Sequence, residues 1–140
     1  MNIPYRISNI QTPQFAMFPQ NYKAETKTDI QTVFKFWVHN DLLDIVCISD
    51  ISYYQGDNMV LFAQVQCAFV IDGETANELK ASDRIPVDFL RYIATITVGA
   101  ARGIISAKTE NTVLNAVVLP PINLRDSITD DIVISENKTK

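Results

Sequence analysis

Three stretches of alternating apolar and polar residues predict the β-strands of this chain. They cover residues 27–39, 42–54 and 59–71, and the last of them carries no charge. A period of two places alternate side chains on one face of a strand, so each stretch has one face suited to a core. The residues on these apolar faces are Ile30, Phe34, Phe36, Val38; Leu43, Ile45, Cys47, Ile51, Tyr53; and Met59, Leu61, Ala63, Val65, Cys67, Phe69, Ile71.

Short connections between these strands predict an antiparallel meander. Residues 40–41 separate the first two stretches, and the Gly-Asp pair at 56–57, suited to a hairpin, lies between the second and the third. The first 24 residues contain three prolines, and we expect an extended lead-in with one edge strand around 7–15. The polar residues 74–84 predict an irregular crossing connection.

A helix beginning near Pro86 is apolar over most of its circumference. Asp88, Arg91, Thr95 and Arg102 recur at spacings near multiples of 3.6 and form one narrow polar stripe. One sheet covers only one helix face. This pattern therefore favours packing against a second subunit over an explanation within a single chain.

After the helix, residues 113–119 are apolar, and we expect an extended run. The pair Pro120-Pro121 ends this run, because proline has no backbone N–H to donate a hydrogen bond to a neighbouring strand. The remaining residues allow either a frayed tail or one short helix. The predicted fold class is therefore α+β: a four-stranded antiparallel sheet, a meander with a crossover, packed with a long helix. We expect a single domain at residues 1–125 and a C-terminal tail at 126–140.

Composition excludes several classes of protein. The 140 residues are 47% hydrophobic, and 12 basic against 16 acidic residues give a net charge of −4. Without a Lys/Arg cluster, we expect no nucleic-acid partner. The apolar stretch at 92–107 is interrupted by Arg102 and is shorter than a membrane span, so we expect no membrane insertion. With no signal peptide evident, the expected location is the cytoplasm.

Catalytic chemistry has little support in the sequence. His39 is the one histidine, and no metal-ligand spacing or phosphate-binding loop is present. Cys47 and Cys67 are expected to be free thiols, although strand register leaves a disulfide open. We therefore expect a protein that is not an enzyme and has no metal and no cofactor.

Four short motifs, in the order and spacing found here, resemble a known family. They are Gln-Val-Gln at 64–66, Arg-Tyr-Ile-Ala at 91–94, Ala-Arg-Gly at 101–103 and Leu-Pro-Pro-Ile-Asn-Leu at 119–124. The corresponding family motifs are Glu-Val-Gln, an aromatic followed by Ala, Arg-Gly, and Leu-Ala-Pro-Val-Asn-Phe. Over roughly residues 25–125, the chain is similar to SecB, the bacterial protein-export chaperone, and its SecB-like relatives.

The resemblance implies an ATP-independent holdase, a chaperone that keeps unfolded or precursor polypeptides in an apolar groove. It implies a homotetramer built as a dimer of dimers. The family's client-binding positions fall on Leu61, Ala63 and Val65, and patterning adds Tyr92 and Ile96 as an opposing wall. The alternative is that all five residues are buried core.

The residues that would hold a client match the family better than those that would deliver the client to its partner, the translocation motor SecA. Gln64 replaces an acid that in the family docks the translocation motor SecA, and the first 24 residues contain no acid. SecB-like proteins also serve as chaperones dedicated to an antitoxin, and the sequence leaves that role open. A different class also stays open: a non-chaperone binding module for a hydrophobic ligand or a single protein partner.

Overall fold

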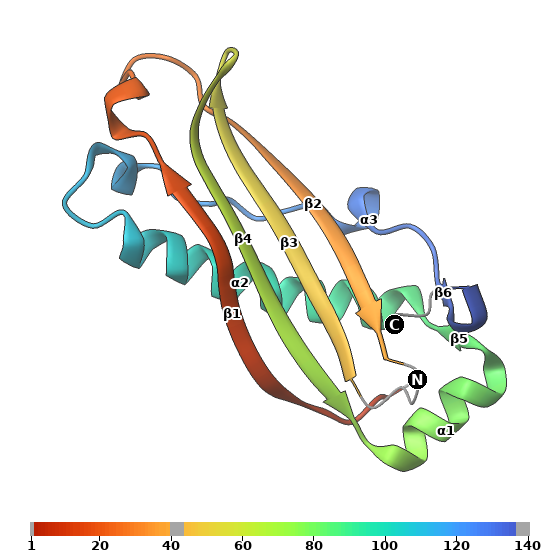
Figure 1. The fold of residues 1–140 in the computed structure, drawn as a ribbon. Helices are drawn as coiled ribbons and strands as arrows, with labels where there is room; N and C mark the ends of the chain where they lie inside the picture. Colours follow the sequence, from red (N-terminus) through yellow and green to blue (C-terminus); the bar gives the residue numbers. More distant parts are fainter. Residues whose placement is uncertain (1, 40–43, 137–140) are drawn as a thin grey trace.

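A four-stranded antiparallel sheet forms one layer of the protein, as the sequence predicts. The computed structural model describes residues 2–39 and 44–136. The strands lie in the order β1-β4-β3-β2 (Figure 1). Their bounds are Tyr5–Met17 for β1, Asp29–Val38 for β2, Asp44–Gln55 for β3 and Asn58–Ile71 for β4. β1 is the predicted edge strand, and the chain crosses from it to the opposite edge before β2.

The strand register follows the alternation in the sequence. Gly56, with a φ of 61°, makes the tight turn between β3 and β4. In this register Cys47 lies directly opposite Cys67, and both thiols are free and buried. The predicted connection at 40–41 and the predicted strand residues 42–43 lie outside the described residues.

The long helix α2, Val87–Lys108, forms the second layer and crosses one face of the sheet (Figure 1). It contacts mainly the two central strands, β3 and β4. Pro86 lies immediately before its first turn, and Asp88 is favourably placed in that turn. The sheet face below the helix and the inward face of α2 form the core.

The connection after β4 is a helix and corrects the prediction of an irregular crossing at 74–84. Helix α1 spans Gly73–Ser82, and the Asp72 carboxylate accepts a hydrogen bond from the Thr75 amide at 3.4 Å. Such an N-cap stabilises the first turn. Only Ala76 and Leu79 supply buried apolar side chains. That apolar stripe is too narrow to stand out in a polar sequence.

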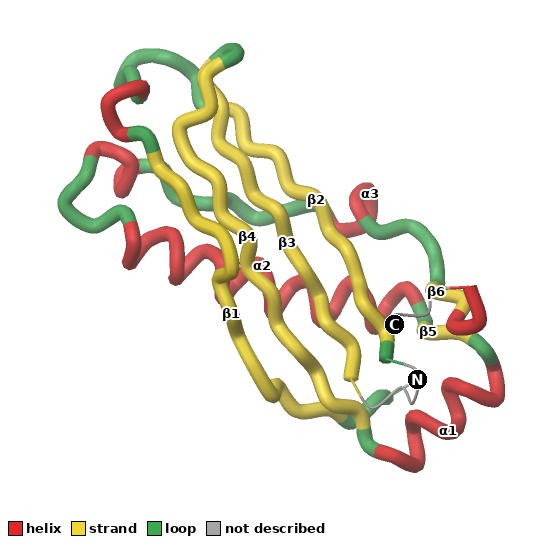
Figure 2. The backbone as a smooth tube through the Cα atoms, viewed as in Figure 1, coloured by secondary structure: helices red, strands yellow, loops and turns green. Residues whose placement is uncertain are grey.

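A second correction concerns the run after α2. Val113–Ala116 forms a 3₁₀ turn, in which the Thr112 hydroxyl accepts a hydrogen bond from the Leu114 amide at 3.2 Å. The segment 117–123 has no regular secondary structure and follows α2 back along its length (Figure 2).

The C-terminal residues add a short helix and a small sheet. Helix α3 spans Leu124–Ser127, and β5, Arg84–Ile85, pairs with β6, Ile132–Val133. A 3₁₀ turn at Ile134–Glu136 follows. Ile128 and Ile134 are buried in the core next to α2. The described part of the predicted tail therefore contributes to the domain.

Candidate functional site

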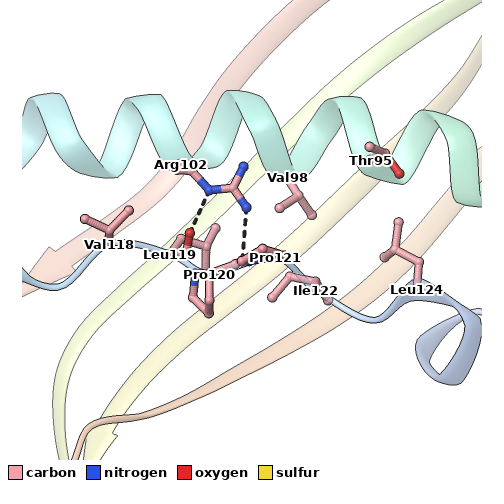
Figure 3. A pocket seen from close by; sticks show the side chains of 9 residues that line it. All are labelled: Thr95, Val98, Arg102, Val118, Leu119, Pro120, Pro121, Ile122 and Leu124. Atoms are coloured by element: carbon pink, nitrogen blue, oxygen red, sulfur yellow. Dashed lines mark hydrogen bonds between the residues drawn. The ribbon is translucent and has the colours of Figure 1, made fainter.

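A groove of about 530 Å³ lies between helix α2 and the segment that follows it. It is open to solvent, and Val118 on its rim is 64% exposed. Most of its wall is apolar (Figure 3). The lining residues are Thr95, Val98 and Arg102 of α2, and Val118, Leu119, Pro120, Pro121, Ile122 and Leu124 of the segment.

Arg102 fixes the segment beside the helix. Its Nε donates to the Leu119 carbonyl at 2.6 Å, and its Nη2 donates to the Pro120 carbonyl at 3.0 Å (Figure 3). The two prolines have no backbone N–H, so the segment cannot join the sheet as a central strand. Side-chain hydrogen bonds from the helix therefore hold this wall of the groove.

Arg91 holds the chain further along in the same way. Its Nε donates to the Ile128 carbonyl at 2.9 Å. Arg91 and Arg102 are eleven residues apart, about three helical turns, so they lie on the same flank of α2. The predicted polar stripe is therefore the flank that binds the C-terminal segment. Sequence reasoning missed this role, although the three-turn spacing was a signal for it.

The two arginines differ in their electrostatic partners. Arg91 also pairs with the Asp88 carboxylate at 3.5 Å. Within residues 2–39 and 44–136, no carboxylate forms an ion pair with Arg102. Arg102 thus brings an uncompensated positive charge to an otherwise apolar groove.

Tyr53 lies in the core close enough to Arg102 to feel its charge. Its side chain is 0% exposed, and its hydroxyl has no hydrogen-bond partner in the described part of the chain. Burial raises the pKa of Tyr53 to about 12, and the charge of Arg102 opposes that rise. The hydroxyl therefore stays protonated at neutral pH.

The five residues predicted to contact a client do not share one surface. Leu61, Ala63 and Val65 of β4 are 0% exposed beneath α2, as in the buried-core alternative. Tyr92 is 52% exposed, and Ile96 is partly buried against the other half of the core. A client could reach the three β4 residues only if α2 moved away from the sheet.

Gln64 lies on the opposite face of the sheet from these three residues. Its Nε2 donates to the Asp50 carboxylate at 2.9 Å, and the same carboxylate pairs with Lys35 at 3.1 Å. This part of the outer face is therefore a neutral hydrogen-bonded cluster.

A second apolar surface lies along β1 and the other flank of α2. Ile7 and Ile10 on β1 are 43% and 49% exposed. The Tyr5 hydroxyl donates to the Tyr92 hydroxyl at 3.0 Å and connects this strand edge to the helix. Ile96 and Ile104 lie on the same side of α2. We call this region the β1–α2 surface, and it consists of Tyr5, Ile7, Ile10, Tyr92, Ile96 and Ile104.

The buried thiols are poorly suited to nucleophilic chemistry. Burial raises the pKa of Cys47 to about 12 and also raises the pKa of Cys67, while a hydrogen bond with Thr97 opposes both shifts. A protonated thiol is a weak nucleophile. No group of three or more potential metal ligands occurs among the described residues. Within the same residues, no helix is long and apolar enough to cross a membrane.

Comparisons with known proteins give no family assignment. No protein-family model matches the chain, and no curated protein matches its sequence.

Proposed function

We infer that this protein is an ATP-independent holdase that binds unfolded polypeptides, as the sequence resemblance to SecB suggests. The observation that carries the proposal is the open apolar groove beside α2, with its volume of about 530 Å³. Unfolded chains expose apolar side chains that folded proteins bury. A groove of this kind binds them by removing apolar surface from water, without ATP and without a catalytic group.

The groove is also suited to clients of varied sequence. Its walls are Val, Leu, Ile and Pro side chains, which contact apolar groups without demanding one hydrogen-bond pattern. Specific recognition would require several convergent polar groups. Here Thr95 and Arg102 are the polar residues of the lining. The aliphatic walls would accordingly accept many different apolar sequences.

Assembly into a homotetramer, a dimer of dimers, is part of the same proposal. The edge strand β1 and the β1–α2 surface offer the apolar area through which copies would associate. Gly99 and Gly103 lie on the exposed face of α2, and a Cβ added at either would meet nothing within 4 Å. Their small size is therefore not required by packing within one chain.

The client class we propose is unfolded or precursor polypeptides in the cytoplasm. Transfer to SecA has less support, since Gln64 and Asp50 belong to a neutral cluster with Lys35. Service to a dedicated antitoxin needs only the groove and is compatible with the same geometry.

A matched pair of substitutions tests the holdase. Val118 lines the groove and is 64% exposed, whereas Val113 is 54% exposed and lies outside it. We expect the wild type to suppress aggregation of an unfolded client at stoichiometric ratios, measured by light scattering. Val118→Asp should weaken suppression, and Val113→Asp should not. A wild-type protein that is monomeric and fails to suppress aggregation would refute the proposal.

The second candidate is a binding module for a small hydrophobic ligand, and the groove volume favours it. Sites for such ligands usually have volumes of about 300–1,000 Å³. Mass spectrometry of an organic extract of the purified protein separates the two functions. A stoichiometric apolar molecule, released when Val118 is changed to Asp, would favour the ligand module.

A further inference from the structure

The Arg102 guanidinium has N–H donors that are not used in hydrogen bonds to the segment, and its positive charge faces the groove. Two of its five N–H groups are occupied by the carbonyls of Leu119 and Pro120. Carbonyl oxygens solvate a cation but leave its net charge in place. The other arginine on this flank, Arg91, already has the Asp88 carboxylate. Among residues 2–39 and 44–136, Arg102 therefore has no anionic partner, whereas Arg91 has one.

The rest of the groove defines what would carry that anion. Thr95 is the other polar residue of the lining, and its hydroxyl donates to the Arg91 carbonyl at 2.9 Å. The remaining lining is aliphatic, so the ligand needs an apolar body next to its charged group. The groove is open at the exposed Val118, so a chain longer than the groove can extend out of it there. These features fit a segment within a polypeptide better than an enclosed small molecule.

We propose that the groove selects extended apolar polypeptide segments that contain an Asp or Glu side chain, whose carboxylate binds Arg102. This inference rests on the proposed function and adds the chemical class of client. Arg102 sits at the wall between helix and segment (Figure 3), where the aliphatic lining replaces part of the surrounding water and so makes an ion pair stronger than in bulk water.

A pair of fluorescent peptides tests the selection on the full-length protein. Both consist of Leu, Val and Ser, have blocked ends and differ only in one central Glu or Gln. We expect the Glu peptide to bind about tenfold more tightly than the Gln peptide in fluorescence anisotropy at low salt, as for a charge-assisted hydrogen bond. Arg102→Gln should abolish the difference, and Arg91→Gln should preserve it.

A second variant leaves the Arg102 hydrogen bonds to the segment intact. Val118→Glu places a carboxylate on the rim of the groove, next to Leu119, whose carbonyl Arg102 already binds. We expect the Glu peptide to lose its advantage in Val118→Glu and to keep it in Val118→Gln. This pair remains informative if Arg102→Gln does not fold.

The outcomes separate the two proposals. Equal binding of both peptides by the wild type, with aggregation suppression intact, would overturn the carboxylate preference and leave the holdase standing. A preference that survives Arg102→Gln or Val118→Glu would place the anion site elsewhere and would also overturn it. Failure to bind either peptide and failure to suppress aggregation would reject the holdase itself.

Discussion

The inward and outward faces of helix α2 differ far more than their sequences suggest. Both are rich in apolar or small residues, but Ile93, Ala94 and Ala101 on the inward face are 0% exposed. On the outward face Tyr92 is 52% exposed, and Gly99 has open space around it. The sheet thus covers one face. Apolar residues of α2 beyond that face stay accessible for assembly or binding.

The largest expected effect concerns the inward face. Ile93→Ala would leave a cavity between α2 and the sheet. The expected loss is about 2–5 kcal/mol in the free energy of unfolding, measured by urea denaturation. Ile104→Ala, on the partly exposed flank, should cost less. Equal losses at the two positions in a monomeric sample would show that the faces are not distinct.

Alkaline pH tests the burial of the sheet face below α2. Burial raises the pKa of Cys47 from 9.0 to about 12. Between these two pH values the thiol is ionised in the unfolded chain but still neutral in the folded protein. Stability should be fully present below pH 9 and should fall as the pH rises toward 12. In reducing buffer, Cys47→Ala should lose less stability than the wild type over that range. Parallel curves would contradict this account of burial.

Substitutions of the glycines on the outward face should stabilise the chain, unlike substitutions on the inward face. Gly99→Ala and Gly103→Ala should each raise the free energy of unfolding of the isolated chain by about 1 kcal/mol, because alanine favours the helix. Gly56→Ala is the control and should destabilise, since Gly56 has a φ of 61°. Destabilisation of a monomeric sample by Gly99→Ala would show that the outward face is not open.

If copies associate through these glycines, the same substitutions should weaken the assembly. Light scattering measures that effect separately from the urea experiment. Stabilised chains that dissociate would support close approach of a second copy at Gly99 and Gly103. An unchanged mass would place the interface elsewhere on the β1–α2 surface or on β1.

The smallest expected effect is that of Tyr53→Phe, which removes only the hydroxyl of a buried side chain near Arg102. Its buried hydroxyl has no partner among the described residues, so Tyr53→Phe should change the free energy of unfolding by less than about 1 kcal/mol, toward higher stability. Tyr53→Ala, which also removes the ring, should cost about 3–5 kcal/mol. A large loss in Tyr53→Phe, seen by urea denaturation, would mean that the hydroxyl is satisfied in solution.

Most of the sheet was predictable because strand alternation is a local property. Residues 59–71 are apolar at every odd position, and the structure buries that face almost completely. Helix α1 was missed because Ala76 and Leu79 are its only apolar anchors. Asp72 is a suitable N-cap residue in the sequence, but a cap residue alone does not establish that a helix follows.

The groove was only partly predictable. The segment 119–124 stands out in the sequence, yet nothing in it shows that Arg102 binds its carbonyls. The contacts Arg102–Leu119 and Arg91–Ile128 span 17 and 37 residues. Pairings at such separations depend on how the chain returns along α2, which local patterns do not encode.

Local sequence patterns were enough to predict the strands, the long helix, the exclusion of Pro120 and Pro121 from the sheet, and the excess of apolar surface on that helix. Periodicity and proline stereochemistry act within a few residues, so they can be read locally. Which side of α2 is covered, and which chain segment the two arginines hold, depends on contacts between residues far apart in the sequence. The sheet can cover one face of a helix, and long-range packing decides which face that is.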